Sequence, residues 1–148
     1  HPSNNRLLYF CLLSKKFIEH QTIIPHSNTK KFLKEFEELC KTKSPLITLC
    51  HLKIFNGKAK YLEFDGKGLG LSIHIAINKN FNRFYEDFIK LNKKYNCIIN
   101  IYKNSYMSNK KIKNIYKFKY KNFSKEVKKI NNNFVFVNNV FKKDIFYK

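Results

Sequence analysis

The clearest pattern in this sequence is a strict alternation of apolar and small or polar positions between residues 69 and 77. The odd positions are all leucine or isoleucine, whereas the even positions are Gly70, Ser72, His74 and Ala76. A period of two predicts a β-strand with one apolar face, which must pack on a core. The small residues on the other face would let a ligand approach the backbone closely.

Similar patterns predict three more strands and two helices. Residues 17–25 are rich in β-formers and end at a proline, and residues 46–55 and 97–102 are further β-rich stretches. Apolar residues at helical spacing predict helices from Thr29 to Thr42 and from Phe81 onward through Ile89. The N-cap candidates for these helices are Ser27, Asn28 and Thr29 for the first, and Asn78 and Asn80 for the second.

The resulting order, βαββαβ, predicts an α+β fold of the split βαβ type, in the ferredoxin-like order. In this arrangement both helices cover one face of an antiparallel sheet, and the strands at 46–55 and 69–77 lie side by side or nearly so. The side chains expected between helices and sheet are Phe36, Leu71, Ile73, Ile75, Phe84 and Phe88.

The chain divides at about residue 103. Residues 1–103 are expected to form the βαββαβ domain, and residues 104–148 a basic, helical C-terminal extension. Short helices are predicted around residues 112–116 and 123–130, followed by an apolar run at 134–137 and a last helical turn near 140–145. The extension is too rich in lysine to fold alone, so we expect it to pack on this domain or on a further one.

The net charge of +20 indicates an anionic partner, which could be phosphate, nucleic acid or a membrane surface. A biased, AT-rich coding sequence would also produce such a lysine- and asparagine-rich chain. Arginine occurs only at Arg6 and Arg83, although nucleic-acid-binding surfaces favour it, so we do not expect nucleic acid as a partner. No apolar run approaches the length of a membrane span, and the first residues do not have the pattern of a signal peptide.

Several kinds of site are disfavoured by spacing. The cysteines (Cys11, Cys40, Cys50 and Cys97) form no Cys-x-x-Cys pair, which is typical of reduced, buried thiols in an intracellular protein. The histidines have no metal-ligand spacing, so no metal site is expected. The acidic residues fall mostly on helix faces, which argues against a two-carboxylate hydrolase. Gly66, Gly68 and Gly70 precede a strand, whereas the dinucleotide-binding fingerprint leads into a helix.

A polar set remains on the predicted strands, namely Gln21, Lys53, Ser72, His74 and Lys103. Two lysines at strand ends, beside small polar positions, could hold an anion or act as acid and base. The alternative is an exposed sheet surface with solvated lysines, and the pattern alone leaves both interpretations open.

The same stretches resemble the C-terminal part of the vanillyl-alcohol-oxidase type of FAD-dependent oxidoreductases. The nearest branch is the decaprenylphosphoryl-ribose 2'-oxidase group, and sugar-lactone oxidases are more distant. The motif Gln-Tyr-Gln-Phe-Val-Val-Pro of that branch is matched by residues 19–25, Glu-His-Gln-Thr-Ile-Ile-Pro. Leu-Lys-Arg-Phe-Gly is matched by residues 52–56, Leu-Lys-Ile-Phe-Asn. Looser matches follow in the same order at residues 62–76 and 99–106.

This resemblance implies an enzyme, or part of one, that oxidises a sugar or polyprenyl-phospho-sugar hydroxyl in cell-wall or polysaccharide biosynthesis. It implies FAD as cofactor and Lys103 and Lys53 as catalytic residues. The implied substrate-binding residues are Gln21, Phe55, Ser72 and His74. The flavin-binding domain of the family precedes this region, so we expect the chain to be the substrate or cap part of a longer polypeptide, inactive alone. A cytoplasmic location follows, which could include the inner face of the membrane.

The alternative function is a stand-alone basic module that binds phosphate-bearing ligands or RNA. It would use the same lysines on an open sheet face. Aromatic side chains on the strands would favour it, but here the aromatic residues follow the pattern of the core.

Overall fold

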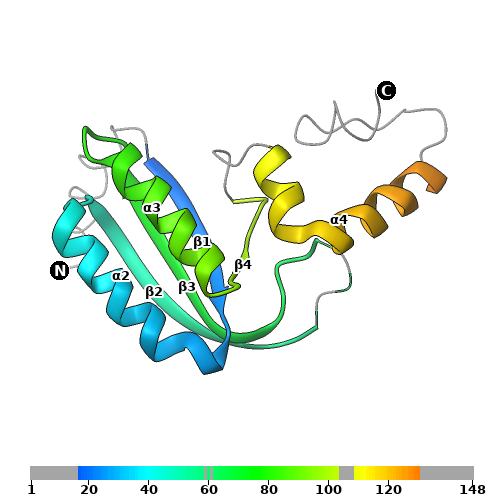
Figure 1. Cartoon of the computed structure of the whole chain (residues 1–148), viewed down its shortest axis with the longest axis horizontal. Coiled ribbons are helices and arrows are strands. Elements are labelled where there is room, and N and C mark those ends of the chain that lie inside the picture. The colour runs from blue at the N-terminus through cyan, green and yellow to red at the C-terminus, as the bar shows by residue number, and fades with distance from the viewer. Residues whose placement is uncertain (1–16, 59, 61, 104–108, 131–148) are drawn as a thin grey trace, which may run out of the picture.

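A computed structural model describes residues 17–58, 60, 62–103 and 109–130, and it has the predicted α+β architecture. Helices α2 and α3 lie side by side on one face of a four-stranded antiparallel sheet (Figure 1). The elements are β1 (Phe17–Ile24), the short 3-10 helix η1 (His26–Asn28), α2 (Thr29–Lys43), β2 (Ile47–Asn56), β3 (Lys67–Ala76), α3 (Phe81–Lys94), β4 (Ile98–Ile99) and α4 (Asn109–Ile130). The predicted fold class is therefore confirmed.

The strand order in the sheet is β2-β3-β1-β4, the order expected for a split βαβ fold. Strand β1 pairs along its whole length with β3, from Phe17 opposite Ala76 to Ile24 opposite Leu69. Strand β3 also pairs with β2, where His51 lies opposite Ser72. The two predicted strands at 46–55 and 69–77 are thus direct neighbours, and β3 holds the sheet together.

The face of the sheet under the helices carries the hydrophobic core. Leu71, Ile73 and Ile75 of β3 are buried there, as the alternation predicts. They meet a layer of aromatic rings from both helices, in which Phe84 and Phe88 are fully buried. Phe36, which the sequence places in the core, is only partly buried, but its ring lies 5.3 Å from that of Phe88.

The two asparagines at the helix starts occupy N-cap positions but do not cap with their side chains. Asn28 Nδ2 donates to the carbonyl oxygen of Tyr95 at 3.1 Å, and Asn80 Nδ2 donates to that of Ser44 at 3.1 Å. Each amide thus joins its helix start to a distant segment. The positions predicted for capping are correct, but the bonds stabilise tertiary structure instead.

The last strand is shorter than predicted. Only Ile98 and Ile99 pair with β1, whereas the sequence predicts a strand over 97–102. The reason lies in Asn100, whose Oδ1 accepts a hydrogen bond from the backbone N–H of Tyr102 at 3.1 Å. An asparagine that bonds its own backbone two residues on favours a turn over a strand. Lys103 therefore ends a turn and does not end a strand.

The described part of the basic extension is α4, which consists of two helical pieces joined at a bend at Lys117, where φ is 32°. The prediction of two short helices is correct in substance, because the bend separates them. Tyr116 and Tyr120 of α4 are buried against Ile99, Ile101 and Leu62, and the hydroxyl of Tyr116 donates to the carbonyl oxygen of Ile99. The predicted apolar run at 134–137 and the helical turn at 140–145 lie outside the described residues.

Three of the cysteines are described, and all three are free thiols. Cys97 is buried as expected and Cys40 is partly buried, but Cys50 is exposed. The expectation of a buried thiol is wrong for Cys50 because β2 is an edge strand, where even Ile54 is 81% exposed. None of the helices in the described part of the chain combines the length and the apolar character needed to cross a bilayer.

The packing of Phe88 yields a stability prediction. Its ring contacts rings from both helices and the ring of His20 of β1, so its removal leaves a cavity at the centre of the core. We expect Phe88→Ala to lower the free energy of unfolding by about 3–5 kcal/mol in chemical denaturation. Phe118→Ala, at a 72% exposed position, is the control and should change it by less than about 0.5 kcal/mol. Similar losses for both variants would contradict this description of the core.

A second prediction concerns pH. His20 is fully buried beneath α3, with its Nδ1 3.4 Å from the Tyr85 hydroxyl. Burial lowers the pKa of His20 to about 3. A hydrogen bond with Asn92 favours the protonated form and offsets part of this effect. The folded protein therefore keeps this imidazole neutral, while the unfolded chain takes up a proton below about pH 6.5.

Stability should consequently fall as the pH falls, by about 2 kcal/mol between pH 7 and pH 5 from His20 alone. His20→Phe keeps a ring and removes the titration, so the pH dependence of its unfolding free energy should be flatter by that amount. The control is His26→Asn, which removes an exposed histidine and should leave the dependence as it is. An equally steep dependence in His20→Phe would exclude His20 as its source.

Candidate functional site

The face of the sheet opposite α2 and α3 carries the polar residues of the strands that are not buried in the core. Along β1 the even positions point to the helices, so Glu19 and Gln21 lie on the other side. The antiparallel register places Glu19 beside His74 and Gln21 beside Ser72. We call this side of β1, β2 and β3 the open face, since no described helix covers it (Figure 1).

Glu19 is the centre of a group of interacting side chains on the open face. Its carboxylate accepts hydrogen bonds from Gln21 Nε2 at 2.5 Å and from Ser72 Oγ at 3.4 Å. Lys103 Nζ lies 3.2 Å from Oε2, and His74 Nε2 lies 3.9 Å from Oε1. We call these five residues the Glu19 network. It gathers four of the six residues that the sequence predicts for the site.

The charge state of Glu19 follows from these partners. Burial by itself would raise the pKa of this carboxyl group. The hydrogen bonds from Lys103 and Gln21, together with the positive charges of Lys103 and His74, outweigh burial and lower the pKa of Glu19. The carboxylate is therefore ionised at neutral pH and is held in place by donors on several sides.

Asn100 connects the turn that carries Lys103 to the sheet. Its Nδ2 donates to Gln21 Oε1 at 2.8 Å, and its backbone N–H donates to the Gln21 carbonyl oxygen at 2.9 Å. Gln21 is thus bonded on both sides, to Glu19 through its amide nitrogen and to Asn100 through its amide oxygen. This arrangement fixes the position from which Lys103 reaches Glu19.

The other two predicted residues, Lys53 and Phe55, line a hollow that adjoins the network. Its volume is about 90 Å³, and its walls are Gln21, His51, Lys53, Phe55, Phe64, Gly70, Leu71 and Ser72. Phe55 and Phe64 form an aromatic wall with ring centroids 5.3 Å apart. Gln21 and Ser72 belong both to the hollow and to the Glu19 network, so all six predicted residues lie in one continuous area.

The glycines before and within β3 are explained by packing. A Cβ atom at Gly70 would collide with the ring of Phe55, and one at Gly68 would collide with the carbonyl oxygen of Ile24. These residues let the aromatic wall and the end of β1 approach the β3 backbone. A phosphate-binding glycine turn leads into a helix, whereas these glycines lead into or lie within β3, so they do not form such a turn.

These residues do not fit a flavin. The hollow is far smaller than the roughly 300–1,000 Å³ of pockets that enclose ligands of that size. All four glycines of the sequence lie in the segment that leads into β3 or in β3 itself, so none opens a helix whose N-terminus could face a pyrophosphate. In the described part of the chain, no three histidine, cysteine or acidic side chains are grouped in a way that could hold a metal ion.

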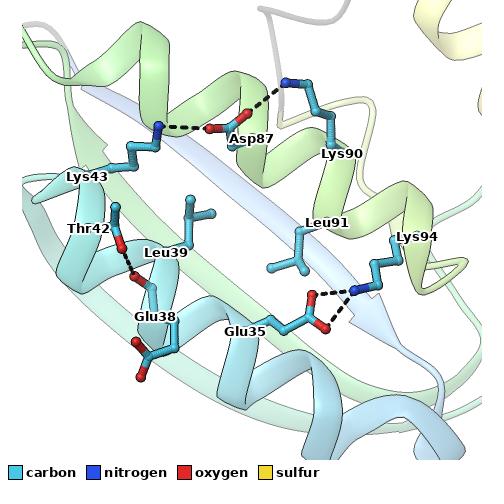
Figure 2. Close-up of a pocket in the computed structure, with 9 residues that line it drawn as sticks. All are labelled: Glu35, Glu38, Leu39, Thr42, Lys43, Asp87, Lys90, Leu91 and Lys94. Atoms are coloured by element: carbon cyan, nitrogen blue, oxygen red, sulfur yellow. Dashed lines mark hydrogen bonds and ion pairs between the residues drawn. The ribbon is translucent and has the colours of Figure 1, made fainter.

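A second and larger hollow, of about 520 Å³, lies between α2 and α3 (Figure 2). Its floor is Leu39 and Leu91, and its walls are charged. The charges face one another in pairs across the groove, Lys94 with Glu35 at 2.7 Å and Lys43 with Asp87 at 3.1 Å. Because these ion pairs link the two helices, we interpret the groove as a helix–helix contact and not as a ligand site.

Sequence reasoning missed four residues of the candidate site, namely Glu19, His51, Phe64 and Asn100. Most acidic residues of the chain fall on predicted helix faces, so Glu19 did not stand out as a site residue. Its spacing of two from Gln21 nevertheless places both residues on one face of the strand. His51 has the same spacing from Lys53. Asn100 carries no such signal, since its position depends on the turn that ends β4.

No protein-family model matches this chain, and no curated protein matches it either.

The Glu19 network yields a prediction that NMR can check. Since Lys103 contributes the largest of the favourable interactions with the carboxylate, Lys103→Met should raise the pKa of Glu19. The pKa of Glu19 is lower in the folded protein than in the unfolded chain. Its interaction with Lys103 therefore stabilises the fold at pH values above the unfolded pKa, and this stabilisation is lost as the pH falls through the folded-state pKa. A pH titration followed through the carbon-13 resonance of the Glu19 carboxyl carbon measures the pKa of Glu19 in the wild-type protein and in Lys103→Met. The control is Lys90→Met, which removes one of the two lysine partners of Asp87 and should leave the pKa of Glu19 as it is. An unchanged Glu19 pKa in Lys103→Met would show that the pair does not form.

Proposed function

We propose that this chain is the substrate-binding part of an FAD-dependent oxidoreductase that oxidises a hydroxyl of a sugar or sugar-phospholipid. The observation that carries the proposal is the convergence on the open face of all six residues implied by the sequence resemblance. They come from β1, β2, β3 and the turn after β4, segments separated by up to about 80 residues. Strand alternation already predicts that Gln21, Ser72 and His74 share a face. The support for a common site is that Lys103, Lys53 and Phe55 lie in the same area.

The chemistry of the site suits a hydroxylated ligand. The ionised carboxylate of Glu19 can accept a hydrogen bond from a hydroxyl, and the ammonium of Lys103 can donate one to it. Ser72 and Gln21 can each do both. The rings of Phe55 and Phe64 offer an apolar wall for the C–H face of a sugar ring, at the side of the hollow where Lys53 and His51 could meet a phosphate group.

In this proposal the chain binds and orients the hydroxyl, and the flavin would accept the hydride. Because the described residues do not fit a flavin, it would be held by another part of the polypeptide. In this proposal Lys103 binds the oxygen atom of the substrate hydroxyl. Its ammonium lies 3.2 Å from Glu19 and is half exposed, so it can hold the substrate oxygen while the carboxylate receives the hydroxyl hydrogen bond.

The alternative, a module for RNA, has less support from the open face. Four-stranded sheets that bind RNA stack bases on aromatic side chains of their central strands. Here the corresponding positions in the middle of β1 and β3 are Glu19, Gln21, Gly70 and Ser72. A carboxylate at the centre of the face would also repel phosphates.

The proposal is tested first by binding. We expect amide resonances of the open face, Ser72 and Gln21 among them, to shift when the chain is titrated with pentoses, hexoses and their phosphates. Lys103→Met and Glu19→Gln should each weaken this binding about tenfold, since each removes a charge-assisted hydrogen bond. Lys90→Met, a paired lysine on α3, is the control. Shifts that are absent, or that are the same in Lys103→Met as in the control, would contradict the proposal.

Oxidation is the second readout of the same variant. In a polypeptide that joins this chain to a flavin domain, Lys103→Met should slow substrate-dependent flavin reduction by about 100-fold or more in stopped-flow measurements. An unchanged rate would remove Lys103 from the site. Shifts of the open-face resonances with an oligonucleotide, and none with sugars, would favour the RNA-binding alternative.

A further inference from the structure

The second half of helix α4 has one face packed on the domain and the other exposed. Tyr120, Phe123 and Val127 face Ile99 and Leu62 in a hydrophobic cluster. With 3.6 residues per turn, the opposite side of the helix carries an exposed row of residues, which we call the outer stripe. The outer stripe consists of Phe118, Lys121, Lys125 and Lys129.

The outer stripe carries uncompensated positive charge. Helix α4 contains nine lysines and a single acidic residue, Glu126, which pairs with Lys129 at 3.1 Å. Lys121 and Lys125 form no ion pair with any residue that the structure describes. Lysines four residues apart on a helix repel each other, so this arrangement disfavours the isolated helix. An anionic surface placed against the stripe would remove that repulsion.

An apolar residue begins the stripe. Phe118 is 72% exposed and directly follows Lys117, where the helix bends. The bend turns this phenylalanine away from the cluster that buries Tyr116 and Tyr120 on either side of it in sequence. An exposed aromatic side chain in a row of lysines is typical of helices that lie in a membrane interface.

We propose that the outer stripe of α4 docks on a bilayer surface that contains anionic lipids. The lysines would contact lipid headgroups, and Phe118 would insert between them. Lipid is favoured over nucleic acid because the exposed ring of Phe118 has no partner on a phosphate backbone. The stripe also contains no arginine, the residue that contacts bases and phosphates bidentately. This proposal concerns a surface separate from the open face and does not depend on the function proposed for it.

The test uses the full chain and vesicles of phosphatidylcholine, with or without phosphatidylserine, in a sedimentation assay. We expect binding to the anionic vesicles alone, weakened by added salt. The double variant Lys121→Glu with Lys125→Glu should lower the partition coefficient at least about tenfold. The control, Lys31→Glu with Lys34→Glu, makes the same change of charge at exposed positions of α2 and should lower it less than about threefold. Equal losses in the two variants would overturn the proposal, because binding would then follow net charge alone.

A second measurement reports insertion directly. The sequence contains no tryptophan, so Phe118→Trp introduces a single fluorophore into the stripe. Its emission should shift to shorter wavelength with anionic vesicles, whereas that of Leu52→Trp, at an exposed position on the opposite edge strand, should not. Absence of the shift in Phe118→Trp would overturn the proposal. So would tighter binding to RNA or DNA than to anionic vesicles, lost in the α4 double variant, because the stripe would then be a nucleic-acid surface.

Discussion

The structure depends on the alternation of side chains along β3. This strand pairs with β1 on one side and β2 on the other, so its register determines which residues of all three strands share a face. Its leucine and isoleucines bury one face under the aromatic layer of α2 and α3. A shift of one residue in either pairing would move Ser72 and His74 into that core and expose its aliphatic residues. The apolar contact of β3 with the helices therefore also positions the polar residues of the open face.

The open face is unusual for the charge of this protein. In a chain with a net charge of +20, the structure places a carboxylate at the centre of the sheet and surrounds it with donors. Glu19 gives Lys103, Gln21 and Ser72 fixed positions, because each has the same acceptor. A face of lysines alone would have been a diffuse anion-binding surface. Pairing with Glu19 instead places hydrogen-bond donors and an acceptor side by side on this face.

Helix α4 and the loop before β3 extend the domain beyond the four strands. Leu62 from that loop and two tyrosines from α4 cover Ile99 and Ile101 at the edge of the sheet where β4 lies. The contact explains how so basic a helix is held on the domain: its apolar residues lie on one side, and its lysines remain in solvent. It also places the lysine-rich surface of α4 apart from the open face, so the two surfaces can bind different partners.

The sequence by itself determined the four strands, the two covering helices, their order and the two faces of the sheet. These features follow from local periodicity, which is strong where a strand or helix has one apolar side, as in residues 69–77 and 81–88. The positions of Gln21, Ser72 and His74 on one face follow from the same rule. Tertiary structure alone decided that Glu19 lies at the centre of the polar network and that Lys103 reaches Glu19 from a turn. Each of these depends on contacts between residues about 50 to 85 positions apart, such as Asn100 with Gln21, and no local pattern records which distant partner a polar side chain will meet.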